Sequence, residues 1–244
     1  MSKKTILITG GNGEKGIGLG VGRRFSKEGW RVIILDVAAE PTPGCQKVTS
    51  ESGGKYYQCD VANKSQVDSV MADIYDEFKK IDVLHSNAGI LQWHPFVEYT
   101  EEQIHREIDI NLKGMFFVGQ PVARKMMEEK DGCIVFTGSM GGKESAANQS
   151  VYAASKGGVI QLAKTLAKEL GPYGIRVNSI CPGIIETNMA DDAPEPEIPW
   201  IKRTPLGRFG TPDDVANIVW FLANSDASYV TGQAFNITGG MMTF

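Results

Sequence analysis

Residues 5–20 read TILITGGNGEKGIGLG, a short β-branched apolar run followed at once by a glycine-rich segment. The run TILIT predicts a buried strand, and the residues after Gly16 have the apolar spacing of a helix. Gly11, Gly13 and Gly16 satisfy the pattern G-x-G-x-x-G between the two elements. Such a turn lets the backbone approach a pyrophosphate, whose charge is met by free N–H groups and the helix dipole. The stretch therefore predicts the first βα unit of an α/β fold.

Short apolar runs and amphipathic stretches continue to alternate along the chain. Further strands are expected at residues 31–36, 55–59, 82–89, 133–138, 175–180 and 233–238, and helices near residues 18–28, 65–79, 101–128, 152–170 and 211–223. This alternation is typical of βαβ units, which form a parallel sheet covered on both faces. Pro121 is expected to interrupt the third helix. We predict one domain, residues 1–244, with a doubly wound parallel sheet of about seven strands.

The composition argues against several classes of partner. A formal net charge of −4 lacks the basic surplus of proteins that bind nucleic acid. No apolar run approaches the roughly 18 to 20 residues that span a bilayer, and residues 5–9 are too short for the core of a signal peptide. We therefore expect a cytoplasmic protein with neither nucleic acid nor membrane as partner. The four cysteines form no C-x-x-C pair and His85, His94 and His105 lack ligand spacing, so we expect no metal site.

Asp36 ends the second predicted strand, 20 residues after Gly16. At this distance from a glycine-rich turn, a carboxylate can accept hydrogen bonds from the ribose hydroxyls of a dinucleotide. The turn and the carboxylate together predict a dinucleotide site.

Tyr152 and Lys156 form the pattern Y-x-x-x-K at the start of a predicted helix. Their side chains therefore share one face, with Cβ atoms about 5 to 6 Å apart. A phenol is a poor base at neutral pH, and a nearby ammonium lowers its pKa by favouring the phenolate. Ser139 lies 13 residues upstream of Tyr152, at the end of a strand where a parallel sheet presents its ligand-binding edge. The three residues predict proton-transfer chemistry at this edge.

Several motifs in this order resemble the short-chain dehydrogenase/reductase family, from Thr5 to about Gly240. Thr9-Gly10 and Gly16-Ile17-Gly18 match the ends of its TGxxxGxG fingerprint, with five residues between the glycines instead of three. Three further matches are Asp60-Val61 with the adenine-binding pair, Asn87-Ala88-Gly89 with the NNAG segment, and Pro182-Gly183 with the PG motif. The resemblance implies a Rossmann-like fold and an NAD(P)-dependent alcohol or ketone oxidoreductase.

The resemblance also implies roles for individual residues. Tyr152 is expected to be the general acid and base, Ser139 to hydrogen-bond the substrate oxygen, and Lys156 to hold the nicotinamide ribose as well. Asn111 matches the family's asparagine that anchors a water for proton relay, and Thr187 matches the threonine that contacts the carboxamide of nicotinamide. The expected cofactor-binding residues are Gly10, Asn12, Gly16, Ile17, Gly18, Asp36, Asp60, Val61, Asn87, Ala88, Gly89, Tyr152, Lys156, Pro182, Gly183, Ile185 and Thr187.

Two residues favour different cofactors. Asp36 should repel the 2′-phosphate of NADP, whereas Lys15 occupies the place where NADP-preferring relatives often carry a basic residue. A carboxylate facing a phosphate imposes both charge repulsion and a lost hydrogen bond, while a lysine on a lengthened glycine turn can swing into water. We therefore predict NAD as cofactor, with NADP less favoured.

Residues 182–207 read PGIIETNMADDAPEPEIPWIKRTPLG and follow a predicted strand. Their prolines and acidic residues forbid a long helix, and they lie at the edge where open α/β sheets bind ligands. We predict a substrate lid at about residues 184–207; the alternative is a solvated loop. The candidate substrate contacts are His94, Glu144, Gln149 and Trp200.

We expect an enzyme that transfers hydride between NAD and a secondary alcohol or ketone, such as a sugar, a polyol or a hydroxy acid. Two alternatives stay open. One is an NADPH-dependent 3-oxoacyl reductase, which Asp36 disfavours. The other is a non-catalytic dinucleotide-sensing protein, which would not need the four residues Asn111, Ser139, Tyr152 and Lys156. The apolar C-terminal residues TGGMMTF predict a homotetramer or homodimer, as is common in the family.

Overall fold

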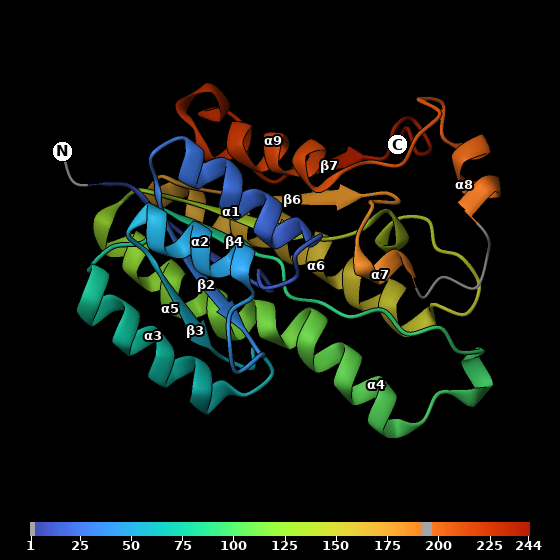
Figure 1. The fold of residues 1–244 in the computed structure, drawn as a ribbon, viewed down its shortest axis with the longest axis horizontal. Coiled ribbons are helices and arrows are strands. Elements are labelled where there is room, and N and C mark those ends of the chain that lie inside the picture. The colour runs from blue at the N-terminus through green and yellow to red at the C-terminus, as the bar shows by residue number, and fades with distance from the viewer. Residues whose placement is uncertain (1–2, 192–196) are drawn as a thin grey trace.

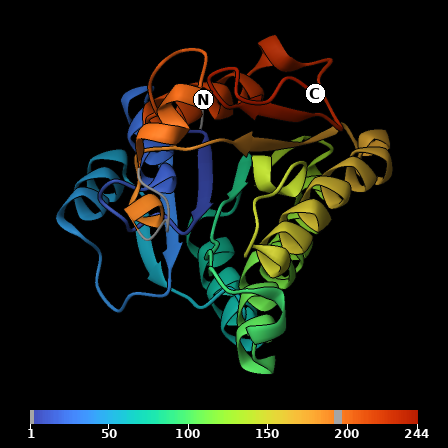
Figure 2. The same cartoon turned by 90° about the vertical axis from the view of Figure 1, so that its right-hand side faces the viewer.

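The computed structural model describes residues 3–191 and 197–244. Within these residues, seven strands form one parallel sheet with helices on both faces (Figures 1 and 2). The strands are β1 (Thr5–Thr9), β2 (Arg31–Asp36), β3 (Lys55–Gln58), β4 (Val83–Ser86), β5 (Gly132–Thr137), β6 (Ile175–Pro182) and β7 (Ala234–Ile237). Their order is β3-β2-β1-β4-β5-β6-β7, and every neighbouring pair is parallel. The predicted Rossmann-like, doubly wound fold is confirmed.

The strand order reverses between β1 and β4. The chain moves outward from β1 to β3 and then returns to the other side of β1 to build β4 through β7. The connections diverge at this switch point, and open α/β sheets bind their ligands there. The segments that follow β1 and β4 therefore border the same crevice.

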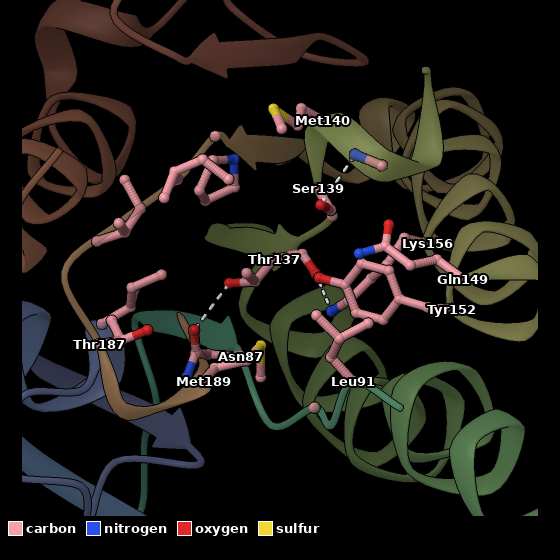
Figure 3. A pocket seen from close by; sticks show the side chains of 18 of the residues that line it. Asn87, Leu91, Thr137, Ser139, Met140, Gln149, Tyr152, Lys156, Thr187 and Met189 are labelled. Carbon is pink, nitrogen blue, oxygen red and sulfur yellow. Dashed lines mark hydrogen bonds between the residues drawn. The ribbon is translucent and has the colours of Figure 1, made fainter. Parts of the chain in front are cut away.

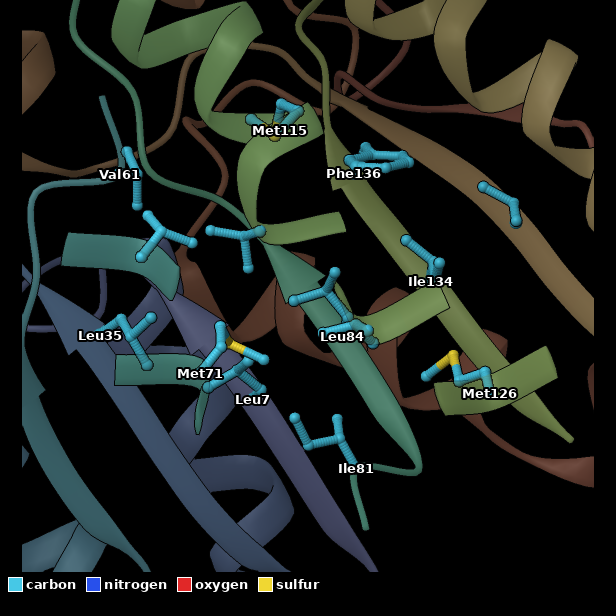
Figure 4. Close-up of a cluster of buried hydrophobic side chains, with 14 of the residues drawn as sticks. Leu7, Leu35, Val61, Met71, Ile81, Leu84, Met115, Met126, Ile134 and Phe136 are labelled. Carbon is cyan, nitrogen blue, oxygen red and sulfur yellow. The ribbon is translucent and has the colours of Figure 1, made fainter. Parts of the chain in front are cut away.

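Two layers of helices cover the sheet. The helices of the structure are α1 (Ile17–Lys27), α2 (Pro43–Ser52), α3 (Lys64–Phe78), α4 (Glu101–Ile108), α5 (Gly114–Glu129), α6 (Ser150–Leu170), α7 (Asn188–Asp191), α8 (Glu197–Arg203) and α9 (Pro212–Ala223). Side chains of a strand alternate between faces, so Leu7 packs with α3, α5 and α6 (Figure 4), whereas Ile6 and Ile8 pack with α1, α2 and α9. Both faces are thus apolar, as a buried parallel sheet requires.

Helix α2 was not predicted. Residues 43–52 contribute only Cys45 and Val48 as buried apolar side chains to α2, so the apolar period is too short to see. Both ends of this helix nevertheless carry residues that commonly begin and end helices. The Thr42 side chain caps the N-terminus with Pro43 in the first turn, and Gly53 ends the helix in the left-handed conformation at φ 69°.

The predicted interruption at Pro121 is wrong. Pro121 lies inside α5, where it has no N–H to donate to the helix. The buried side chains of Val118 and Val122, on either side of it, pack in the core under the sheet and hold the helix in place. The expected helix at residues 101–128 is divided earlier, by a π-helical turn at Asp109–Lys113.

The predicted lid begins where β6 ends. It contains two short helices, α7 and α8, with no long helix among its described residues, while its residues 192–196 lie outside the described part. Its start is fixed to Gly210, three residues beyond its end, because Gly210 N–H donates to the Ile184 carbonyl at 3.0 Å and Glu186 N–H donates to the Gly210 carbonyl at 2.9 Å. No helix in the described ranges is long and apolar enough to cross a membrane.

Candidate active site

A cavity of about 500 Å³ opens along the carboxyl edge of the sheet. Its walls come from the segments after β1, β2, β4, β5 and β6, from the start of α6, from α7 and α8, and from Met241 and Met242 near the C-terminus. The cavity extends from Asp36 at one end past the glycine turn to Tyr152. Residues far apart in the sequence therefore share one binding space.

The glycine-rich turn forms one wall, with Gly10, Gly13, Gly16 and Ile17 along the cavity. Gly18 lies behind them, where a Cβ atom would come within 2.4 Å of the Gly10 carbonyl oxygen. Gly10 itself has φ 67°, a conformation that side chains rarely adopt. The turn is thus packed so closely on α1 that only glycine fits at these places, which leaves a bare backbone toward the cavity.

Asn12 ties the lengthened turn to the protein. Its backbone N–H donates to Asp36 Oδ2 at 3.0 Å, its Nδ2 donates to the Glu40 carbonyl, and its Oδ1 accepts from Thr42 N–H at 2.6 Å. The Asn12 side chain is therefore occupied within the protein and does not line the cavity. Asp36 does line the cavity, whereas Lys15 is exposed and lies outside it.

The segment after β4 joins the turn to the catalytic wall. The backbone N–H groups of Asn87 and Ala88 both donate to Thr9 Oγ1, at 2.9 and 3.0 Å. Asn87 Nδ2 donates to the Gly10 carbonyl at 3.0 Å, and its Oδ1 accepts from Thr137 Oγ1 at 3.1 Å (Figure 3). Asn87, Ala88 and Gly89 all line the cavity.

Ser139, Tyr152 and Lys156 meet at the far end of the cavity (Figure 3). Ser139 follows β5, and the other two occupy the first turns of α6. Lys156 Nζ donates to the Thr137 carbonyl at 2.8 Å and lies 5.8 Å from the centre of the Tyr152 ring. Ser139 Oγ accepts from Gly141 N–H at 3.0 Å. All three side chains are almost fully buried.

Burial dominates the proton affinities of this group. It raises the pKa of Tyr152, and a hydrogen bond with Ser139 opposes that rise. It also lowers the pKa of Lys156 to about 8. The pKa of Tyr152 thus lies above its ordinary value, contrary to the expectation that Lys156 lowers it, because burial of the phenolate is the largest effect and the opposing hydrogen bond comes from Ser139.

Asn111 lies in the π-helical turn and is fully buried. Its Oδ1 accepts from Ile90 N–H at 2.8 Å, and its Nδ2 donates to the Ile90 carbonyl at 2.9 Å and to Ser155 Oγ at 3.1 Å. The amide thus fixes the segment after β4 against α6. Its part in a proton relay stays a prediction.

The remaining cofactor candidates fall into two groups. Pro182, Gly183, Ile185 and Thr187 line the cavity, whereas Asp60 and Val61 do not. The carboxylate of Asp60 accepts from Ala62 N–H at 2.9 Å, and Val61 is buried in the core near α5.

Three of the four substrate candidates, Glu144, Gln149 and Trp200, line the cavity. His94 does not, which corrects its expected position. Its Nε2 pairs with Gln103 Nε2 at 3.1 Å and its ring packs edge-on against Tyr99, whereas the neighbouring Trp93 does line the cavity.

Sequence reasoning missed most of the apolar lining. The missed residues are Leu91, Met140, Met189, Met241 and Met242, together with the charged Arg203. Met140 follows Ser139 directly, so adjacency to a motif could have indicated it. No local signal places Met241 and Met242, because their position depends on how the C-terminus folds back over the edge of the sheet.

The histidines do not gather. His85 is fully buried on β4, where its Nε2 pairs with Thr137 Oγ1 at 3.0 Å and burial lowers its pKa to about 3. Within residues 3–191 and 197–244, no group of three or more His, Cys, Asp or Glu side chains could hold a metal ion.

The residues present fit a dinucleotide. A bare glycine turn ahead of α1 offers N–H groups to a pyrophosphate, and Asp36 stands at the end of the cavity that suits an adenosine ribose. The other end holds Tyr152 and Lys156, where a nicotinamide ribose and a substrate would meet.

Comparison with known proteins gives consistent matches over the whole chain. The model of a family described as enoyl-(acyl carrier protein) reductase matches residues 10–242. The 3-oxoacyl-[acyl-carrier-protein] reductase FabG of Thermotoga maritima is 40% identical over 242 residues, which are 98% of each chain. Subunit BbsD of (2S)-[(R)-hydroxy(phenyl)methyl]succinyl-CoA dehydrogenase from Thauera aromatica is 36% identical, over 100% of this chain and 98% of its own. A short-chain type dehydrogenase/reductase from Mycobacterium marinum superimposes with a TM-score of 0.91 at 33% identity, over 100% of this chain and 97% of that one.

Proposed function

The chain belongs to the short-chain dehydrogenase/reductase family of oxidoreductase enzymes, and from this premise we propose that it transfers hydride between NAD and a secondary alcohol or ketone. One observation carries the proposal. A single cavity holds Asp36 at one end and the group Ser139, Tyr152 and Lys156 at the other. Family membership also sets aside the non-catalytic dinucleotide sensor, since the chain is an enzyme.

The chain's own groups handle the proton and the substrate oxygen. When bound, the nicotinamide supplies the hydride for reduction or accepts it in oxidation. Tyr152 gives a proton to the substrate oxygen in reduction and takes it in oxidation. Ser139 donates its hydroxyl proton to the same oxygen and stabilises the charge that develops there. Lys156 is fixed through one N–H to Thr137, which leaves two for the nicotinamide ribose.

Asp36 supports the choice of NAD. Its carboxylate lines the cavity, while the competing Lys15 is exposed and outside it. A 2′-phosphate beside Asp36 would meet charge repulsion and lose a hydrogen bond. A difference of about 2 kcal/mol in binding corresponds to roughly 30-fold in efficiency between the cofactors.

The cavity lining narrows the substrate. Leu91, Trp93, Met140 and Met189 give the catalytic end an apolar wall, with Gln149 as one polar contact. We propose a hydroxy acid or related ketone that carries an apolar part, in preference to a sugar or polyol whose many hydroxyls would lose water without partners.

A 3-oxoacyl reductase is the second candidate. The relative from Thermotoga maritima that is 40% identical carries that name, and an apolar lining also suits an acyl chain. This candidate shares the proton chemistry of the first and differs in substrate and in cofactor.

One set of assays tests both candidates. The purified protein is assayed with NAD and NADP in oxidation and with both reduced forms in reduction, against hydroxy acids, polyols, small apolar ketones and a 3-oxoacyl thioester. We expect NAD to be preferred, and Asp36→Ala to reduce that preference by at least tenfold, while Lys15→Ala leaves it unchanged. Equal or better use of NADP by the wild type, with fastest turnover of the thioester, would favour the second candidate instead.

We also propose a homo-oligomer. Phe244 is 73% exposed and Tyr229 is fully exposed, and apolar side chains of this kind are commonly covered by a partner. Removal of residues 241–244 would be a poor test, because Met241 and Met242 line the cavity. Phe244→Ser changes an exposed side chain that does not line the cavity, so light scattering on this variant and on the wild type reports assembly without altering the site. A wild type that is monomeric at micromolar concentration contradicts the proposal.

A further inference from the structure

Glu107 is a buried carboxyl that the mechanism above does not use. It lies on α4, one helical turn before Asn111, and its side chain is fully buried. Its Oε1 accepts from Gln92 N–H at 3.2 Å, while its Oε2 is buried without a hydrogen-bond partner in the described part of the chain. A buried carboxyl oxygen without a partner is costly and calls for a reason.

The segment after β4 brings Glu107 close to the catalytic pair. Two N–H groups of this segment donate to buried side chains of α4 and the π-helical turn that follows it. Ile90 N–H donates to Asn111, and Gln92 N–H donates to Glu107. At Gly89, a Cβ atom would lie 3.1 Å from Asn111 Oδ1 and also 3.1 Å from Lys156 Nζ. Asn111 and Lys156 therefore both lie beside Gly89, and Glu107 contacts the same segment three residues further along, at Gln92.

We propose that Glu107 is a proton store behind the active site, which takes up the proton released by alcohol oxidation and returns it for ketone reduction. The proposal deepens the function proposed above and rests on it for the reaction. Glu107 touches neither substrate nor nicotinamide, so it acts through Lys156 and Tyr152.

The proton affinities suit this role. Burial raises the pKa of Glu107 to about 7, although Gln92 N–H, Lys156 and Tyr99 all oppose the rise. The pKa of Lys156 is about 8, so a proton can pass between the two groups at little cost near neutral pH. The titratable groups that act on Glu107 are Lys156 from α6 and Tyr99 from the segment before α4, and its charge in turn raises the pKa of Tyr152.

The segment that contacts Glu107 offers polar atoms that suit water. Gln92 Oε1 and Trp93 Nε1 are buried in this segment and also lack a hydrogen-bond partner in residues 3–191 and 197–244. Buried polar groups of this kind usually hold ordered water, and water molecules carry protons between fixed groups.

The proton and electron balance closes. In oxidation the substrate C–H bond breaks and its two electrons leave with the hydride to the nicotinamide, while the O–H proton passes to Tyr152. The C=O bond forms, and the proton moves from Tyr152 through Lys156 and water to the Glu107 carboxylate, which exchanges it with solvent before the next turnover. Ketone reduction takes the same steps in reverse, so no further oxidant or reductant is needed.

Glu107→Gln distinguishes a proton store from a carboxylate that acts only through its charge, because the two roles predict opposite changes in the rate of alcohol oxidation. Glutamine keeps the acceptor for Gln92 N–H but cannot take a proton. If Glu107 acted by its charge alone, its removal would lower the pKa of Tyr152 and speed alcohol oxidation at neutral pH. As a store, it makes kcat fall by about tenfold near pH 7, less than loss of a direct acid or base would cause, with the KM for NAD unchanged. Glu102→Gln, an exposed carboxyl on the same helix, is the matched control and should behave as wild type.

Infrared spectra of the wild type provide a test that needs neither turnover nor a variant that folds. A protonated buried carboxyl band should disappear as pH rises through about 7. Absence of that transition, or wild-type kcat and an unchanged pH profile in Glu107→Gln, overturns the proposal. A protein that shows the transition but turns over no alcohol or ketone contradicts the proposed function, and with it the role of Glu107 as a store for the reaction.

Discussion

The two walls of the cavity are built in different ways. The catalytic wall places Ser139 at the end of a buried strand and Tyr152 and Lys156 on α6, a helix of 21 residues. The facing wall, residues 184–191 and 197–207, presents Met189 and Arg203 from helices of four and seven residues, and both side chains are exposed. Atoms that move a proton need fixed positions, whereas a surface that recognises substrate can vary around them.

A close backbone contact fixes the catalytic wall further. A Cβ atom at Gly142 would lie 2.6 Å from the carbonyl carbon of Lys156, so the turn after Ser139 rests directly on the backbone of α6. On the facing wall, a Cβ atom at Gly207 would meet nothing within 4 Å, although its φ is 67°. One glycine is needed for space and the other for backbone conformation.

Tyr152→Phe should produce the largest effect on either wall. The ring stays and the only phenolic proton at the site goes, so turnover should fall at least about 100-fold while NAD still binds. Absorbance of the reduced cofactor measures the rate, and a fluorescence titration measures binding. More than about a tenth of the wild-type rate in this variant would remove Tyr152 as the acid and base.

The two glycines give a matched pair with a smaller effect. Gly142→Ala should lower kcat by about tenfold and destabilise the fold by about 1 to 3 kcal/mol, since backbone must shift to admit the methyl group. Gly207→Ala should cost about 1 to 2 kcal/mol from its left-handed backbone, with kcat unchanged. Urea unfolding and initial rates measure the two quantities. Equal losses of kcat in both variants would show that the walls do not differ as described.

Trp200→Ala should have the smallest effect. Trp200 lines the cavity from α8 and carries the Arg203 guanidinium over its ring at 5.1 Å. Its loss removes substrate contact without moving Tyr152, so KM for the substrate should rise a few-fold and kcat should hold. Steady-state kinetics at saturating NAD separate the two constants. A large fall in kcat would mean that this wall also takes part in the chemistry.

The fold and the catalytic wall were accessible from the sequence for the same reason. Buried parallel strands are short apolar runs, and Ser139, Tyr152 and Lys156 lie on or beside such regular elements. Spacing along one strand or helix is therefore enough to bring them together.

Other features depend on contacts between distant segments. The Asn12 side chain is hydrogen-bonded to the backbone of residues 40 and 42, and His94 contacts Gln103 instead of the cavity. Glu107 lies in EEQIHREI, where its sequence neighbours resemble a solvated helix face, and its burial depends on contacts with distant segments such as Gln92. No period or motif in one sequence reports such burial.

The π-helical turn at Asp109–Lys113 has a consequence for the whole run from Glu101 to Glu129. A π turn holds about one residue more than an α turn, so α5 starts about 100° out of rotational phase with α4. A single apolar stripe drawn through the run therefore fits one helix or the other, but not both. Deletion of one residue within the turn would restore the phase and rotate α4 relative to the sheet, carrying Glu107 and Asn111 to different directions. A change of one residue in the length of this turn would therefore reorient both buried polar side chains together.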